Sequence, residues 1–167
     1  MKLLRIGPEG QEKPGALVDG DHYVDLSDEV ADFDEAFFGT GGLERIAPIV
    51  AERAASGVRL PLAGQRVGAP IARPHQIICV GLNYRDHAAE TGQAVPDEPI
   101  LFTKSPNTLV GADDDVRIPR GSTKPDWEVE LGIVIGKRTS YLDSVDDARA
   151  HIAGWVLVND VSERAFQ

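Results

Sequence analysis

The stretches WEVELGIVIG at residues 127–136 and WVLVND at residues 155–160 decide the fold. The first half of WEVELGIVIG alternates polar and apolar residues and its second half is wholly apolar, which is typical of a strand with one end at a polar cavity. The run WVLVND is nearly continuously apolar and ends at Asp160. It therefore predicts a buried strand that delivers this carboxylate at its carboxyl end.

The two glutamates of the first stretch suggest a metal site. Side chains two residues apart on a strand share a face, so Glu128 and Glu130 should point the same way with Cα atoms about 6.5 Å apart. Two such carboxylates brought together with Asp160 would repel one another or need protonation, and a divalent cation removes that conflict. Oxygen ligands without Cys or His favour Mg²⁺ or Mn²⁺ over Zn²⁺, with Ca²⁺ also possible. A solvent-facing strand would give the same Glu-x-Glu alternation, so this alternative stays open.

A short helix supplies a candidate acid–base pair. NYRDHAAETG at residues 83–92 reads as a helix ended by Gly92, between the strand-like runs IICVG and PILFTK. His87 and Glu90 are three residues apart, which places them on one face of the helix. The carboxylate would orient the imidazole and raise its basicity, so His87 could take a proton from water. A surface ion pair is the alternative, and His75 and His151 lack such a partner.

The sequence before residue 69 predicts a small leading α+β domain without catalytic chemistry. Short extended runs occupy residues 3–7 and 16–27, and LERIAPIVAERAASG at residues 43–57 has apolar residues at helical spacing before Gly57. A Pro- and Gly-containing linker at residues 59–76 marks the boundary to a second domain at residues 69–167. Within that domain, Ser144 and Asp147 resemble a capping box that opens a helix closing at Gly154.

Composition excludes several classes of protein. A formal net charge of -10 over 167 residues disfavours binding to nucleic acid or to anionic membranes. No segment approaches the roughly 18 consecutive apolar residues that a membrane span needs. Cys79 is the only cysteine, so an internal disulfide is impossible, and a reducing cytoplasm is the expected location. Its apolar neighbours predict a buried thiol without a catalytic role.

Four motifs together resemble the fumarylacetoacetate hydrolase family. They are CVGLNYRDHAAE, FTKSPNTLVG, DWEVELGIVIGK and GWVLVNDVSER, which follow in order between Arg73 and Gln167. The ending VNDVSERAFQ is most similar to bacterial members that act on 2,4-diketo-3-deoxy sugar acids such as the fuconate derivative, some of which are labelled ureidoglycolate lyases. Members of the family continue well beyond the position of Gln167, through a Gly-rich stretch and a lysine that helps to stabilise an enolate.

The resemblance implies a fold and a set of site residues. The fold would be α+β, with the first part of a mixed β-sandwich roll at residues 69–167 following the small domain at residues 1–68, and the protein would be a homodimer. The metal ligands would be Glu128, Glu130 and Asp160, with His87 and Glu90 as the dyad on a helix that orders over bound substrate. The positions that line the family's pocket would be Lys104, Arg164 and Gln167, which could also form ordinary surface pairs.

The expected reaction is hydrolytic cleavage of a C–C bond in a 1,3-diketo (2,4-dioxo) acid, as in an acylpyruvase, with pyruvate or a related 2-oxo acid as one product. A decarboxylase or tautomerase of a β-keto acid such as oxaloacetate is the nearest alternative, because the same enolate serves these reactions. A non-catalytic metal-binding module is the alternative from another class.

Overall fold

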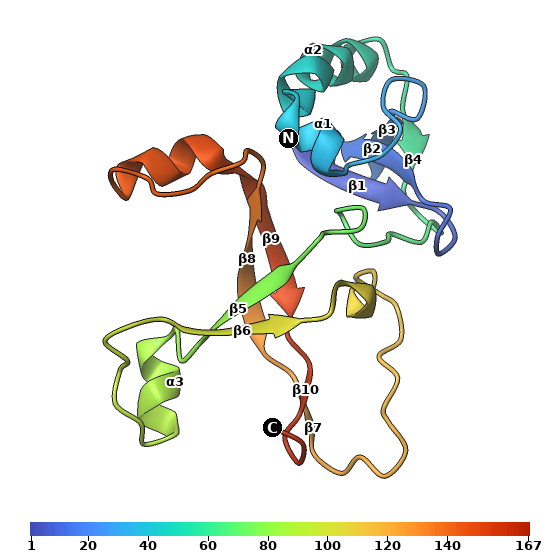
Figure 1. The fold of residues 1–167 in the computed structure, drawn as a ribbon. Coiled ribbons are helices and arrows are strands. Elements are labelled where there is room, and N and C mark those ends of the chain that lie inside the picture. Colours follow the sequence, from blue (N-terminus) through green and yellow to red (C-terminus); the bar gives the residue numbers. More distant parts are fainter.

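The computed structural model describes residues 1–167, and its first part is an antiparallel sheet covered by two helices. The strands follow the chain order β1-β2-β3-β4 across the sheet, and both helices lie between β3 and β4 in the sequence (Figure 1). The strands are β1 (Lys2–Ile6), β2 (Lys13–Leu17), β3 (His22–Asp25) and β4 (Leu60–Pro61), and the helices are α1 (Glu35–Gly39) and α2 (Gly42–Ala55).

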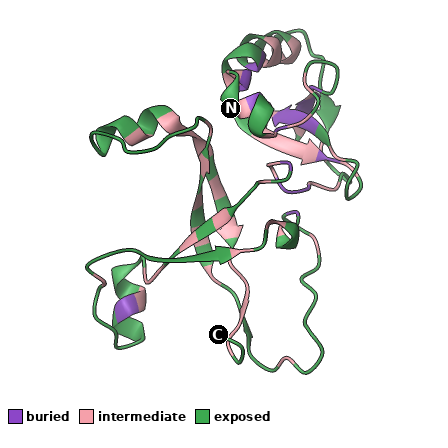
Figure 2. Cartoon of the chain, in the orientation of Figure 1, coloured by how far each residue is buried: buried purple, intermediate pink, exposed green.

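The buried core of the protein lies in this part. One apolar cluster joins the sheet to the two helices, and buried residues gather there in Figure 2. Its members are Ala16, Val24, Leu26, Phe33, Phe37 and Ile46. Helix α1 begins where the Asp34 side chain accepts a hydrogen bond from the backbone N–H of Phe37. Beyond α2, Gly57 has φ +77, a conformation that favours glycine and stops the helix as its sequence predicts.

The second part consists of three two-stranded antiparallel ribbons. In the first ribbon, β5 (Ile77–Gly81) pairs with β6 (Ile100–Lys104), and α3 (Arg85–Glu90) lies between them in sequence. The longest ribbon pairs β8 (Val129–Ile135) with β9 (Ile152–Asn159). The third pairs the short strands β7 (Pro125–Asp126) and β10 (Ser162–Glu163). Two 3₁₀ helices, η1 (Pro106–Thr108) and η2 (Asp146–His151), complete the elements.

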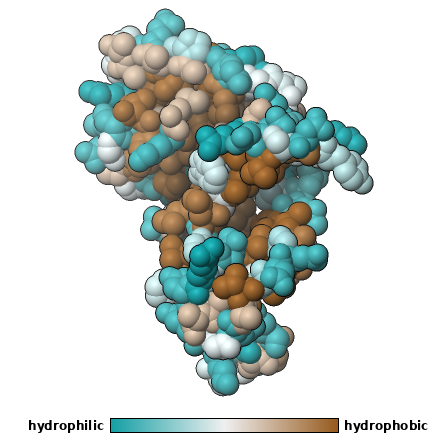
Figure 3. All heavy atoms as spheres, turned by 90° about the vertical axis from the view of Figure 1, so that its left-hand side faces the viewer, coloured by the Kyte–Doolittle hydropathy of each residue, from teal (hydrophilic) through white to brown (hydrophobic).

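The two faces of the β8–β9 ribbon differ in exposure. Alternate residues on one face are large, apolar and more than half exposed: Val129, Leu131, Ile133, Ile135, Trp155 and Leu157. Apolar side chains also reach the surface across the middle of the molecule in Figure 3. The opposite face, which includes Glu130, is partly buried. The alternation that the sequence shows from Trp127 onward thus corresponds to two distinct faces of one strand.

The predicted α+β fold is confirmed, but one predicted helix does not form. The segment after Ser144 forms the 3₁₀ helix η2 instead of an α-helix, and Gly154 lies inside β9 opposite Val134. The Ser144 hydroxyl does meet the Asp147 carboxylate at 2.8 Å, so the capping signal is real, but only a short 3₁₀ turn follows it. None of the helices is long and apolar enough to cross a membrane.

Candidate active site

The backbones of three acidic residues lie at one end of the β8–β9 ribbon. Glu130 lies in β8 opposite Val158 of β9, and Glu128 immediately precedes β8. Asp160 follows β9, and its backbone N–H donates a hydrogen bond of 2.8 Å to the carbonyl oxygen of Glu128. The side chains of Glu128 and Glu130 are partly buried, whereas Val129 between them is 64% exposed. The glutamates therefore share the more protected face, as the sequence predicts.

Two cationic side chains contact these carboxylates. The Arg164 guanidinium donates a short hydrogen bond to Glu128 and a second, of 3.0 Å, to the Asp126 carboxylate. It also donates one of 2.7 Å to the side-chain oxygen of Gln167. Arg164 and Gln167, both expected to line the pocket, thus lie together beside Glu128.

Lys104, at the end of β6, connects the first ribbon to this site. Its ammonium group contacts Oδ1 of Asp160. The same group donates hydrogen bonds to the carbonyl oxygen of Val161 at 2.8 Å and to the hydroxyl of Ser162 at 3.0 Å. Lys104 therefore joins the β5–β6 ribbon to the segment that carries Asp160.

The residues fit a divalent cation by chemical type and by backbone position. The Asp160 side chain is only 11% exposed, and its Oδ1 is in an ion pair with the Lys104 ammonium group. A nearly buried carboxylate that is charge-balanced by one cationic group could bind another cation in its place. With Asp160 turned to Lys104 and Glu128 to Arg164, however, no three acidic side chains gather closely enough to share one ion.

Charges at the site shift several pKa values. The hydrogen bond from Arg164 holds the pKa of the Asp126 carboxyl below its ordinary value, and the charge of His87 contributes in the same direction. The hydrogen bond to Glu128 raises the pKa of Arg164 further. Burial raises the pKa of the Cys79 thiol, and the negative charge of Asp160 adds to this shift.

Cys79 belongs to the surroundings of the site although the sequence indicates only an apolar setting. In the β5–β6 register, Lys104 lies opposite Ile77. Because Cys79 is two residues beyond Ile77 on the same strand, it shares the face that carries Lys104. Its side chain is partly buried, which is less than the buried thiol that the sequence predicts.

His87 and Glu90 both lie on α3, where the sequence places them. No hydrogen bond or ion pair joins the imidazole to Glu90. His87 is partly buried, whereas Glu90 is exposed. Their role as a dyad stays a prediction.

Asp126 and Glu163 extend the polar network beyond the residues expected from the sequence. Asp126 precedes Glu128 by two positions, so the alternation that singles out Glu128 and Glu130 could have found it. Glu163 accepts hydrogen bonds from the hydroxyl of Ser122 and, at 3.0 Å, from the backbone N–H of Lys124. Its partners are about forty residues away in sequence, so no local pattern reveals them.

Comparison with known proteins gives the family of the chain. Residues 76–167 match the model of the fumarylacetoacetate hydrolase C-terminal domain. The chain belongs to the fumarylacetoacetate hydrolase family. This family model covers both strand runs and all eight expected site residues. It does not distinguish the subgroup that acts on 2,4-diketo-3-deoxy sugar acids, so that subgroup stays a prediction.

Similar proteins place the chain within this family of hydrolases. A Burkholderia ambifaria protein, named provisionally as a hydrolase, is 48% identical over 171 residues that cover all of this chain and 57% of the relative. A structure from Mycobacterium abscessus, named provisionally as a 2-hydroxyhepta-2,4-diene-1,7-dioate isomerase, is 31% identical with a TM-score of 0.73 and covers 98% of this chain and 53% of that one. The chain thus spans little more than half the length of these relatives.

The fold also matches a more distant structure. Maleylpyruvate hydrolase from Sphingobium, solved in complex with manganese(II) and pyruvate, is 22% identical with a TM-score of 0.79. The match covers 98% of this chain and 60% of the Sphingobium chain. At this level of identity the likeness establishes the shared fold alone.

Proposed function

We propose that this chain forms part of a divalent-metal-dependent hydrolase that cleaves a C–C bond in a 1,3-diketo acid and yields pyruvate or a related 2-oxo acid. The observation that carries the proposal is the position of Asp160. Its carboxylate is nearly buried against the Lys104 ammonium group, and its backbone is held beside Glu128 by a hydrogen bond. Membership of a hydrolase family supports a catalytic role for such a site.

Each group has a proposed part in the site. Glu128, Glu130 and Asp160 would hold Mg²⁺ or Mn²⁺, which when bound would act as a Lewis acid for negative charge on the 2-oxo acid end of the substrate. Lys104 and Arg164 are the nearest cations and would contact the substrate carboxylate, with Gln167 beside Arg164. The cations must turn from the acidic side chains to do so, because both now contact those carboxylates.

His87 would activate the water, with Glu90 orienting the imidazole when α3 moves over bound substrate. His87 takes a proton from water, and the oxygen adds to the distal carbonyl carbon. The C–C bond then breaks, which releases a carboxylic acid and leaves its electron pair on the other fragment as an enolate. Protonation of that enolate gives the 2-oxo acid, so no oxidant or further reactant is needed.

A decarboxylase or tautomerase is the second candidate, and the likeness to the Mycobacterium abscessus isomerase favours keeping it. Decarboxylation of oxaloacetate passes through a similar enolate but needs no attacking water. His87 is therefore the residue that separates the two reactions.

The test compares two substrates on one variant, in a protein extended to the length of its relatives. His87→Ala should lower kcat for an acylpyruvate by about 10²- to 10⁴-fold, the usual effect of losing a general base, while oxaloacetate turnover is retained. His75→Ala is the matched control, because His75 is 80% exposed and its nearest charged partner is Glu35 in the leading domain. Equal losses on both substrates would mean that His87 does not activate a hydrolytic water.

A further inference from the structure

The linker after β4 adds to the edge of the first sheet. The backbone N–H of Gly7 donates to the carbonyl oxygen of Arg66 at 3.0 Å, and the N–H of Gly68 donates to that of Arg5 at 2.8 Å. Ile6 and Val67 form an isolated antiparallel bridge between these bonds. The backbone of Arg66 is therefore fixed to the leading domain by hydrogen bonds.

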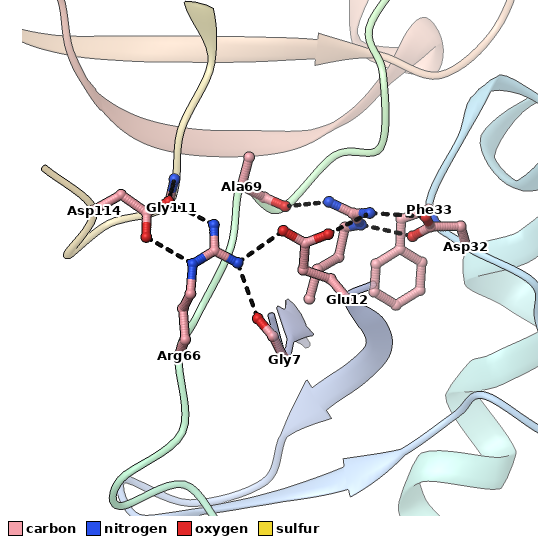
Figure 4. A network of polar contacts seen from close by, with 9 residues as sticks. Gly7, Glu12, Asp32, Phe33, Arg66, Ala69, Gly111 and Asp114 are labelled. Carbon is pink, nitrogen blue, oxygen red and sulfur yellow. Dashed lines mark hydrogen bonds and ion pairs between the residues drawn. The ribbon is translucent and has the colours of Figure 1, made fainter. Parts of the chain in front are cut away.

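From this position Arg66 reaches Asp114, in the segment that joins β6 to β7 (Figure 4). Its Nε donates to Oδ1 at 2.7 Å and a terminal nitrogen donates to Oδ2 at 2.6 Å. The other terminal nitrogen donates to the carbonyl oxygen of Gly7 at 2.9 Å and to Glu12 at 2.8 Å. Two parallel hydrogen bonds to one carboxylate fix both its distance and its orientation, which a single charge contact does not.

Behind Arg66, further pairs extend into the leading domain. The Glu12 side chain is 7% exposed and lies between Arg66 and Arg5, whose contact with Glu12 is 3.5 Å long. Arg5 in turn makes a two-pronged pair with Asp32, with distances of 2.7 and 2.9 Å. Five alternating charges therefore run from Asp32 to Asp114. Because most of these side chains are largely removed from water, solvent screens the pairs less than an exposed pair.

Close packing of glycine supports the same contact. A Cβ atom added to Gly111 would lie 2.3 Å from the carbonyl oxygen of Val67 and 2.9 Å from the Cα of Gly68. The backbone N–H of Gly111 also donates to Oδ2 of Asp114 at 2.6 Å. The 111–114 turn therefore fits against the linker only because residue 111 has no side chain.

The segment fixed in this way has both its ends at the candidate active site. It begins after Lys104, which contacts Asp160, and ends at Ser122 and Lys124, which donate hydrogen bonds to Glu163. Apart from the single turn η1, residues 105–124 contain no regular element that would fix their course. Their middle is held to the leading domain at Asp114.

We propose that the Arg66–Asp114 pair is a clamp through which the leading domain positions the 105–124 segment, and with it the two segment ends that contact Asp160 and Glu163. Arg66 and Asp114 are then positioning residues that touch no substrate. The clamp does not depend on the proposed reaction, because every contact that defines it lies within this chain.

Limited proteolysis under native conditions tests the clamp. Arg117 and Arg120 are exposed trypsin sites within the segment. Arg66→Gln should speed cleavage at these sites by about tenfold, because losing the two-pronged pair raises the population of the opened segment. Arg66→Lys keeps the positive charge but cannot make two parallel hydrogen bonds to Asp114. Its cleavage rate should therefore fall between those of the wild type and Arg66→Gln.

Arg59→Gln is the matched control for charge and for the loss of one trypsin site. Arg59 lies in the same part of the chain but makes an exposed contact of 3.0 Å with Asp19 within the leading domain. The Arg59→Gln substitution should leave the rate of cleavage at Arg117 and Arg120 unchanged. The double variant Arg66→Gln with Asp114→Asn should be cleaved no faster than the faster single variant, since both changes break the same contact.

A spectroscopic measurement distinguishes positioning from general stabilisation. Trp127 is 70% exposed and follows β7 directly, so in a Trp155→Phe background its emission reports on the end of the segment. Arg66→Gln and the charge-neutral Gly111→Ala should both shift this emission below the unfolding temperature, and Arg59→Gln should not. Cleavage of Arg66→Gln at the wild-type rate, or equal acceleration in Arg59→Gln, would overturn the proposal.

Discussion

Replacing Arg164 by Met should strengthen metal binding, although it removes a residue of the proposed active site. Arg164 contacts Glu128, and the two side chains are 28% and 26% exposed. The proposed metal would compete with the guanidinium for this carboxylate. Without the Arg164 guanidinium, the three acidic side chains would repel one another more strongly in the metal-free protein. The metal-free state would then be less stable relative to the metal-bound state.

The size of the effect follows from the exposure of the pair. Two unit charges about 4 Å apart attract by about 4 kcal/mol at an effective dielectric constant near 20. Partial exposure and the lost freedom of both side chains reduce the net contribution to about 1–2 kcal/mol. A difference of about 1.4 kcal/mol changes a dissociation constant tenfold, so we expect Arg164→Met to bind Mn²⁺ about tenfold more tightly.

Isothermal titration with Mn²⁺ at constant ionic strength measures this change. Arg149→Met is the control, because Arg149 is exposed in η2 and forms no ion pair. In the metal-loaded protein, Arg164→Met should bind oxalate more weakly, because Arg164 is proposed to contact the substrate carboxylate. Unchanged or weaker Mn²⁺ binding by folded Arg164→Met would refute the competition between the guanidinium and the metal.

Two further predictions concern ionisation. The hydrogen bond from Arg66 lowers the pKa of Asp114 below its ordinary value of 3.8. The Arg66–Asp114 pair therefore stabilises the fold fully above pH 3.8. This stabilisation is lost as the pH falls through the pKa of Asp114 in the folded protein. Asp114→Asn should therefore show a smaller loss of thermal stability than the wild type as the pH is lowered through this window. Burial raises the pKa of Cys79, so its thiol should react with iodoacetamide at pH 8 more slowly than free cysteine, and Asp160→Asn should speed the reaction by removing a negative charge.

Local patterns predict the elements that carry the site. The period-two alternation from Trp127 and the apolar run that ends at Asp160 identify β8 and β9. The helical spacing before Gly57 identifies α2 in the same way, because all of these signals arise from side chains that are neighbours within one element. Short elements are harder to find: α1 is only five residues long, although Asp34 caps it as the sequence would allow.

Contacts between distant segments could not be predicted. The carboxylate positions follow from strand periodicity, but the pairing of Lys104 with Asp160 and of Arg164 with Glu128 depends on how the ribbons meet. Arg66 and Asp114 are separated by 48 residues, and neither lies in a motif. The prediction that Gly154 ends a helix is wrong, because Gly154 lies inside β9. A glycine that ends a helix and a glycine inside a strand are alike in sequence.

Stoichiometric Mn²⁺ binding by the wild type and by Asp160→Asn tests the central proposal, the metal site, most directly. Electron paramagnetic resonance of free Mn²⁺ counts the bound ions without requiring turnover. The wild type should bind one Mn²⁺ per chain, and both Asp160→Asn and Glu130→Gln should weaken that binding strongly. Glu98→Gln, a change of the same charge at an exposed position outside the site, should leave it unchanged. Equal affinity in the wild type, Asp160→Asn and Glu130→Gln would contradict the proposed metal site.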